Sequence, residues 1–484
     1  MKKYIVLILL FNLIRIIILP FFGMMPQDAY YYFYSEHLSL SYFDHPPMVA
    51  YMQYVFSLVF GKTVFSVKLA DFVVSLGTQL LFFYLAKKVL SPQQSTKALL
   101  LLTSTILISS ISLITTPDVP LLFFWTLAIL FLYKAIFEIK KWNWIWAGIA
   151  MGLAFDSKYT AVGLPAGLFL FLLVSGKYRH YLRQVWPYLA VLLMAIVSLP
   201  VLLWNLDHDF ASFSFQSNQR TDAISKINVS NVVGLVGMQL FLLLPIIFVG
   251  LWWLIVRYSK RFAFKTNRIS AESLFLFSFF LPMFLGFYFL SFFIWVKLNW
   301  LMPAYISGLI LLTPFISNKL IKWQLGISIF FHLLIMVEVF FYPVAVKSDD
   351  TWYGWENFAE QTEQIRDKYP DAFVFSRDGY KTASQLQFFT NKKVYSSNIV
   401  GERALHYDYI GDNVNDLIGK DALFIDSDKR LKTDEKSDGI YPKVSKYFGS
   451  VVELEPILVK KGEKTVRKFY IYYCTDYKGL PAKE

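Results

Sequence analysis

The fold is decided by stretches such as residues 119–137, VPLLFFWTLAILFLYKAIF, in which Lys134 is the one charged side chain. An α-helix rises 1.5 Å per residue, so a helix of this length crosses a hydrocarbon core of about 30 Å. Similar apolar runs recur from Tyr4 to Pro343. The sequence therefore predicts a polytopic α-helical membrane protein.

The composition favours a membrane protein and argues against other classes. Of 484 residues, 56% are hydrophobic and 17% are charged, whereas about one quarter of a soluble domain is charged. The net charge of +12 would suggest a nucleic-acid partner in a soluble protein. Here the positive-inside rule explains much of it, because the basic clusters lie between apolar runs, so we expect no nucleic-acid binding.

About eleven membrane spans are predicted, and their flanking charges orient them. Lys2 and Lys3 precede the first span, which places the N-terminus in the cytoplasm. An odd number of crossings then leaves the C-terminus outside. The spans lie near residues 4–25, 64–88, 98–115, 119–137, 143–156, 159–175, 185–205, 231–256, 273–295, 298–317 and 323–343.

A soluble domain is predicted after the spans. Residues 345–484 carry dense charge and no apolar run of span length. We therefore divide the chain into a membrane domain, 1–344, and an extracytoplasmic domain, 345–484, in which alternating runs predict a small α/β layer. The predicted helices are 355–368 and 380–389, and the predicted strands are 372–376, 393–396, 422–426, 451–459 and 468–474.

Ionisable side chains gather at the outward ends of the predicted spans. They are Asp28, Asp44, His45, Asp118, Lys158, His208, Arg220 and Lys297. A protein that needed only anchoring has no reason to collect acids, bases and cations in one plane. The pattern predicts a membrane enzyme that works at the outer face of the membrane.

Three of these acids have both a chemical and a structural interpretation. Asp28 follows the first span, where a carboxylate can accept a proton from an incoming hydroxyl. Asp44 precedes His45 and two prolines that hold an extended turn. Asp118 lies in a tight turn between two spans. Each could instead begin a helix, since Asp is a common N-cap.

Several motifs together resemble one enzyme family over nearly the whole chain. Asp28 is followed by a tyrosine-rich run, Tyr42 opens the sequence Tyr-Phe-Asp-His-Pro-Pro, and Asp118 lies in Thr-Pro-Asp-Val-Pro-Leu. These motifs are similar to those of bacterial GT-C glycosyltransferases that use polyprenyl-phosphate sugars. The resemblance extends to the family 39-like branch, which is related to protein O-mannosyltransferases and lipid A aminoarabinose transferases.

The resemblance implies an active site on the outer face of the bacterial inner membrane. It implies that Asp28 and Asp118 are catalytic, and that Tyr42, Asp44 and His45 belong to the acceptor side of the first loop. In the aminoarabinose branch a Glu stands where this chain has Asp44, and a distant His joins it on a metal. His208 is the expected counterpart of that His, which leaves a divalent metal open as a cofactor.

The chemistry itself calls for a carboxylate and a cradle of positive charge. A sugar bonded to phosphate already carries a good leaving group, so one base and a cationic cradle suffice. Lys158, Arg220 and Lys297 are the outward cations available to hold the donor phosphate. The alternative for each is a side chain that snorkels to the lipid headgroups.

The predicted function is an inverting transfer of sugar from polyprenyl phosphate to a cell-envelope acceptor. Lipid A, lipopolysaccharide or another lipid-linked glycan is favoured by the resemblance, and protein O-glycosylation is the alternative within the class. A lipid or solute transporter is less favoured, because transporters place ionisable groups near the midplane and show repeated halves. A non-catalytic scaffold that binds a partner is a third possibility. The sequence does not name the sugar.

Overall fold

The computed structural model describes residues 1–221, 227–264, 268–346, 348–428 and 441–480. The chain divides into two compact units. Unit 1 consists of Met1–Leu19, His45–Met52 and Lys68–Met336, and unit 2 consists of Pro20–Asp44, Gln53–Val67 and Val337–Glu484. The predicted domain boundary after residue 344 stays a prediction, as does the assignment of each domain to one side of the membrane.

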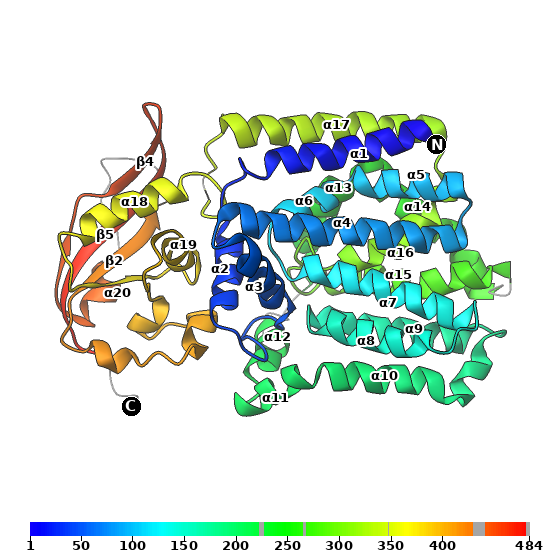
Figure 1. Cartoon of the computed structure of the whole chain (residues 1–484), viewed down its shortest axis with the longest axis horizontal. Helices are drawn as coiled ribbons and strands as arrows, with labels where there is room; N and C mark the ends of the chain where they lie inside the picture. The colour runs from blue at the N-terminus through cyan, green and yellow to red at the C-terminus, as the bar shows by residue number, and fades with distance from the viewer. Residues whose placement is uncertain (222–226, 265–267, 347, 429–440, 481–484) are drawn as a thin grey trace. The chain divides into compact units, whose positions relative to one another are not determined.

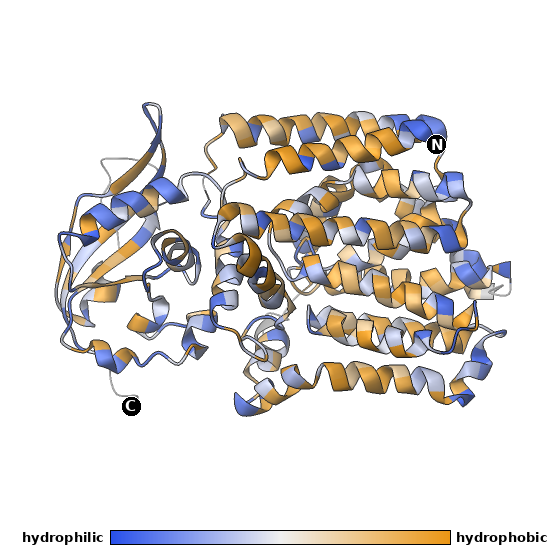
Figure 2. Cartoon of the chain, viewed as in Figure 1, coloured by the Kyte–Doolittle hydropathy of each residue, from blue (hydrophilic) through white to orange (hydrophobic). Residues whose placement is uncertain are grey.

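Unit 1 is a bundle of apolar helices. Figure 1 shows its long helices lying roughly parallel, and Figure 2 shows them hydrophobic along their lengths and hydrophilic at many of their ends. Each predicted span coincides with a helix or a helix pair. The helices are α1 (Lys2–Ile18), α4 (Val64–Val89), α5 (Pro92–Thr103), α6 (Ile106–Leu113), α7 (Asp118–Ile136), α8 (Asn143–Phe155), α9 (Gly163–Val174), α10 (Val185–Val197), α11 (Leu199–Asp207), α12 (Ala211–Thr221), α13 (Val229–Leu243), α14 (Pro245–Phe264), α15 (Ala271–Leu290), α16 (Met302–Leu312) and α17 (Asn318–Phe341).

The number of helices that cross a membrane is not fixed by their lengths. Among the described residues, four helices are long and apolar enough to cross, and three bent pairs raise the count to as many as seven. The bends are 62° between α5 and α6, 47° between α10 and α11, and 117° between α13 and α14. Other apolar helices, such as α8 and α16, are shorter than this length. The chain is a multi-pass membrane protein, and the count of eleven stays a prediction.

Polar side chains stabilise the broken pair α5–α6. A break frees backbone carbonyls that lipid cannot hydrogen-bond, so protein groups must satisfy them. The Arg15 guanidinium donates to the Thr103 carbonyl at 2.5 Å, and the Ser328 hydroxyl donates to the Ser104 carbonyl at 2.6 Å. At the far end of α6, the Lys68 ammonium donates to the Leu113 carbonyl at 2.6 Å. Side chains from α1, α4 and α17 therefore complete the backbone bonding of the broken helix.

Unit 2 is built around a five-stranded mixed sheet. Its strands are β1 (Phe373–Ser376), β2 (Ala422–Asp428), β3 (Phe448–Glu453), β4 (Ile457–Lys461) and β5 (Lys464–Tyr477). The order is β1-β2-β5-β3, with β4 also paired to β5; β1 and β2 are parallel, and the pairs that involve β5 are antiparallel. The helices include α2 (Pro26–Glu36), α18 (Trp355–Arg366), α19 (Lys381–Thr390) and α20 (Tyr441–Ser445). Helix α3 (Met48–Phe60) is divided between the two units.

Two of the predicted strands differ from the structure. Residues 393–396 form only an isolated bridge, between Tyr395 and Phe375. The run 451–459 is two strands: Leu454 still donates its N–H to the Ile471 carbonyl at 2.8 Å, but Pro456 has no N–H to donate. Both halves then pair with the long strand β5. The remaining predicted helices and strands are confirmed to within a few residues at their ends.

Candidate active site

Two charged side chains and one amide of unit 1 lie together, at helix ends that the sequence predicts to face outward. Asp118 begins α7, Lys158 follows α8, and Asn299 lies in the loop before α16. The Lys158 ammonium lies 2.8 Å from both carboxylate oxygens of Asp118, and the Asn299 amide also donates to Asp118. All three come from separate loops, so the sequence alone did not predict that they meet.

Local sequence explains why Asp118 and Lys158 face the interior. Pro117 is the N-cap of α7 and Pro120 lies in its first turn, where a proline needs no amide hydrogen. Lys158 has an extended backbone, with φ −162° and ψ 138°, between α8 and a 3-10 turn. Asp118 is fully buried and Lys158 is 6% exposed. A buried lysine and a buried aspartate stabilise each other only as a pair, because each would otherwise be a lone buried charge.

The second group of residues lies in unit 2 around Asp44. The hydroxyls of Tyr30 and Tyr34 both donate to Oδ1 of Asp44, the first at 2.9 Å. Burial first, and the charge of Asp44 second, raise the pKa of both tyrosines well above the usual value. The phenols therefore stay protonated and act as hydrogen-bond donors at neutral pH.

A segment near the C-terminus completes this group. The backbone N–H of His406 donates to the Tyr30 hydroxyl at 3.2 Å, and the backbone N–H of Phe43 donates to Nδ1 of His406 at 3.5 Å. The predicted acceptor residue Tyr42 is fully buried and stacks on Tyr34 at 4.0 Å with rings 6° apart. Sequence reasoning missed His406, because nothing local links it to a loop more than 360 residues earlier.

Asp28 lies in the first turn of α2 and is fully buried. Its Oδ2 accepts the backbone N–H of Met25 at 2.7 Å, a contact that begins the helix. The structural interpretation of Asp28 is thus present in the molecule. It does not oppose a chemical role, since a helix N-terminus attracts negative charge.

The other predicted site residues lie as follows. Lys297 is exposed in the loop that also carries Asn299. His45 is half-buried in unit 1. Arg220 belongs to helix α12, but its side chain lies outside the described residues. None of these positions tests the roles predicted for them.

The predicted metal ligands are engaged in other contacts. His208 stacks on Trp204 at 4.1 Å, with its Nδ1 2.8 Å from the Trp204 carbonyl, and Asp44 accepts the two tyrosines. Within the described ranges, no group of three or more His, Cys, Asp or Glu side chains could hold a metal ion. The metal role of Asp44 and His208 stays a prediction.

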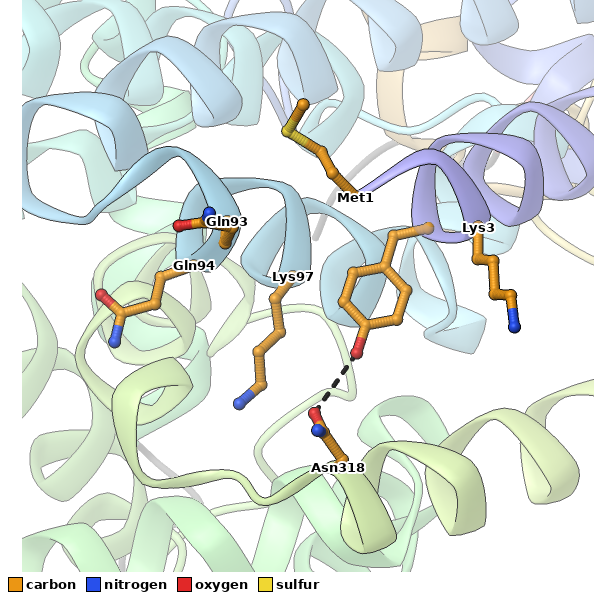
Figure 3. A pocket seen from close by; sticks show the side chains of 7 residues that line it. Met1, Lys3, Gln93, Gln94, Lys97 and Asn318 are labelled. Atoms are coloured by element: carbon orange, nitrogen blue, oxygen red, sulfur yellow. Dashed lines mark hydrogen bonds between the residues drawn. The ribbon is translucent and has the colours of Figure 1, made fainter.

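A separate cavity of about 390 Å³ opens among the first residues of α1, α5 and α17. Figure 3 shows Lys3, Gln93, Gln94 and Lys97 around it, with the Tyr4 hydroxyl hydrogen-bonded to Asn318. Its lining contains no acid. Because it holds no carboxylate that could serve as a base, we do not assign the sugar-transfer chemistry to it.

Known sequences similar to this chain include a family model and a curated relative. The family model for dolichyl-phosphate-mannose-protein mannosyltransferases matches residues 44–204. A lipid A galacturonosyltransferase, RgtD of Rhizobium johnstonii, is 26% identical over 264 residues. That match covers 54% of this chain and 55% of the relative, so about half of each protein is compared.

Solved structures share the fold over almost the entire chain. ArnT from Cupriavidus metallidurans superposes with a TM-score of 0.65 at 13% identity, covering 97% of this chain and 98% of that one. The same enzyme bound to undecaprenyl phosphate gives the same score. The oligosaccharyltransferase AglB of Archaeoglobus fulgidus, with a TM-score of 0.53 at 11% identity, covers 93% of this chain and 73% of its own. The resemblance to GT-C glycosyltransferases expected from the sequence is confirmed.

Proposed function

We propose that this chain, which has the fold of the GT-C glycosyltransferases, transfers a sugar from a polyprenyl-phosphate donor to a lipid-linked glycan of the cell envelope. A structural neighbour binds undecaprenyl phosphate, and a relative is named for its action on lipid A; both support this donor and this acceptor class. The proposal places the protein in the bacterial inner membrane, with its N-terminus in the cytoplasm and its C-terminal domain outside.

The buried pair of Lys158 and Asp118 carries the proposal. An ammonium has three N–H groups, and two of them point to the two Asp118 oxygens. The third is available to a phosphate oxygen. Asp118 therefore acts as a positioning residue that holds Lys158 in place, and Lys158 stabilises the charge that grows on the departing phosphate. Arg220 and Lys297 are proposed as further donors to the same phosphate.

Asp28 is proposed as the base. The acceptor hydroxyl attacks the anomeric carbon from the face opposite the phosphate, and its oxygen forms a bond to that carbon. The bond between the anomeric carbon and the phosphate oxygen breaks, the hydroxyl proton passes to Asp28, and polyprenyl phosphate leaves. Attack from the opposite face inverts the configuration. No general acid is needed, because the phosphate leaves as an anion.

The test compares envelope material from cells with the wild-type gene, without it, and with Asp28→Asn. Mass spectrometry of the lipid fraction should show a sugar increment in wild-type cells that is absent from the other two. Protein level and membrane insertion of the variant are measured alongside. An Asp28→Asn variant with full transfer would remove the proposed base.

A protein acceptor is the second candidate. The matching family model describes protein mannosyltransferases, and this is the observation that favours it. The glycoprotein fraction of the same cells distinguishes the two, because a sugar increment on Ser or Thr peptides, with unchanged lipids, would replace the lipid acceptor by a protein.

A further inference from the structure

Asp156 is a buried carboxyl group that the proposed reaction leaves unused. It directly follows α8, and its backbone N–H donates to the Gly152 carbonyl at 2.8 Å, as a last helical bond. The residue is 6% exposed. Within the part of the chain that the structure describes, its Oδ1 is buried without a hydrogen-bond partner.

A buried carboxyl oxygen without a partner is unfavourable in a structure that serves stability alone. Leaving a buried polar group unsatisfied destabilises the folded chain, and more so when the group is charged. The nearby Ser198 hydroxyl donates to the Gly152 carbonyl at 3.3 Å and also interacts with the Asp156 carboxyl group, but Oδ1 is still without a partner in the described chain. A group kept at such a cost is a candidate for binding something the bare protein lacks.

The backbone places Asp156 beside the proposed phosphate site. Lys158 is two residues further on, so the two Cα atoms lie within about 7 Å of each other. The Met48 backbone N–H, directly after the two prolines of the His45 turn, donates to the Asp156 carbonyl at 2.9 Å. Asp156 therefore joins the turn at His45–Met48 to the loop that carries Lys158.

We propose that Asp156 recognises the donor sugar, by accepting a hydrogen bond on Oδ1 from a ring hydroxyl of the sugar whose phosphate Lys158 binds. The inference rests on the proposed function. In such a donor the ring is bonded directly to the phosphate, so the groups that read the ring must lie next to the group that holds the phosphate. The preferred sugar is neutral or carries an amine, because a uronic acid would bring a second carboxylate against Asp156.

The test measures the binding of three probes to the purified full-length protein. They are polyprenyl phosphate without a sugar, polyprenyl-phosphate hexose, and polyprenyl-phosphate hexuronic acid. Wild-type protein should bind the hexose donor more tightly than the bare lipid phosphate and the uronic donor less tightly than the hexose donor. Asp156→Leu should lower affinity for the hexose donor by about 10- to 100-fold, the worth of a hydrogen bond to a charged group. Its affinity for bare polyprenyl phosphate should stay within twofold.

A stability measurement separates recognition from a structural role. Because Oδ1 has no partner to lose, Asp156→Leu should keep or raise the thermal midpoint while sugar recognition falls. Asp156→Asn keeps the size of the side chain and an amide oxygen that can still accept a hydrogen bond, so it should show a smaller loss of preference for the hexose donor than Asp156→Leu. The exposed Asp207, at the end of α11, supplies the control Asp207→Asn, with no expected change.

The outcomes separate this inference from the function on which it rests. If wild-type protein binds both bare and hexose-bearing lipid and both Asp156 variants keep the preference for the hexose, this inference alone is overturned. An equal loss of affinity for both probes, together with a lowered thermal midpoint, would show that Asp156 has a structural role and would also overturn this inference. If wild-type protein binds neither probe, the donor class is wrong and both proposals fall.

Discussion

Asp118 in unit 1 and Asp44 in unit 2 are both buried carboxylates, yet their partners differ in kind. Asp118 is held by an ammonium and an amide from two distant loops. Asp44 is held by two phenols that lie one turn apart on the same helix, α2. The first arrangement pairs opposite charges, whereas the two phenols of the second are neutral donors. The difference indicates two different uses of the same functional group.

An ion pair can be redirected by a ligand, but a pair of neutral donors cannot. When a phosphate approaches, the Lys158 ammonium can share its charge between Asp118 and the new anion without moving far. The tyrosines of unit 2 have no charge to share, and burial keeps them protonated by raising their pKa. They fix the orientation of Asp44 instead. In the proposed reaction, unit 1 thus provides the charge that binds the phosphate, and unit 2 provides a carboxylate whose orientation is fixed.

The largest expected effect follows removal of the ammonium. Lys158→Ala should lower the affinity for polyprenyl phosphate by at least about 100-fold, because a buried Asp118 loses its only ion-pair partner in the described chain and the phosphate loses its cation. Equilibrium binding of the lipid phosphate measures it. The exposed Lys420 provides a matched control, Lys420→Ala, which should bind like the wild type.

A double variant sharpens that result. Breaking a buried ion pair from one side costs about 3–5 kcal/mol, whereas replacing both partners by apolar groups is often close to neutral. Lys158→Met combined with Asp118→Leu should therefore melt closer to the wild type than Lys158→Met alone, while neither binds the phosphate. If the double variant melts lower than the single one, the two residues do not act as a pair.

A smaller effect is expected in unit 2. Tyr34→Phe removes one of the two phenol donors to Asp44 and leaves Tyr30 in place, a change worth about 1 kcal/mol and about a fivefold loss of turnover. Donor affinity should not change, so kcat falls while KM for the donor stays constant. The partly exposed Tyr54 on α3 gives the control Tyr54→Phe. A drop in donor affinity equal to that of Lys158→Ala would erase the proposed difference between the two carboxylates.

The sequence predicts the helices and strands of the fold much better than it predicts the tertiary contacts between them. An apolar run such as 119–137 predicts a helix, because a backbone segment in lipid must satisfy its N–H and C=O groups internally and a helix does so. The strand break at Pro456 went unpredicted, since the apolar pattern of 451–459 is continuous on both sides of it. Hydropathy also does not give the number of membrane crossings where a span is formed by a short helix or by two helices with a bend between them.

For the candidate site too, the sequence predicts individual residues better than the contacts between them. Asp28, Asp44, Asp118 and Lys158 stood out from the sequence because charged side chains are rare between apolar runs. The pairing of Asp118 with Lys158 depends on how α7 packs against α8, and no local pattern encodes it. Asn299 was given no role at the site, and His406 and Asp156 were missed, each for a different reason. The first is one of many polar loop residues, the second belongs to a distant segment, and the third is defined by the partner it lacks.

A third carboxyl group, Asp426 on β2, shows what happens when burial outweighs the partners that favour the charged form. Burial raises its pKa to about 7, and the nearby Asp378 and Asp349 add to the effect, against the opposing influence of the Ser427 backbone N–H and Arg377. An aspartate in the unfolded chain has a pKa of about 3.9. Between those values the unfolded chain has released a proton that the folded chain retains. Stability is therefore lost as the pH rises from about 4 to 7, and it stays lost above 7.

The smallest expected effect is the replacement of this group by one that cannot ionise. Asp426→Asn should raise the thermal midpoint by about 2–4 °C at pH 8, the shift expected for about 1 kcal/mol, and should change it little at pH 4.5. Sugar transfer and lipid binding should stay at wild-type levels, because Asp426 has no role in the proposed reaction. Melting curves at the two pH values measure it, with the exposed Asp367 at the end of α18 as the control Asp367→Asn. An equal shift of the thermal midpoint at both pH values would mean that the shape of the Asp426 side chain, and not its charge, affects stability. The electrostatic effect of a buried carboxylate would then be limited to Asp118 and Asp44.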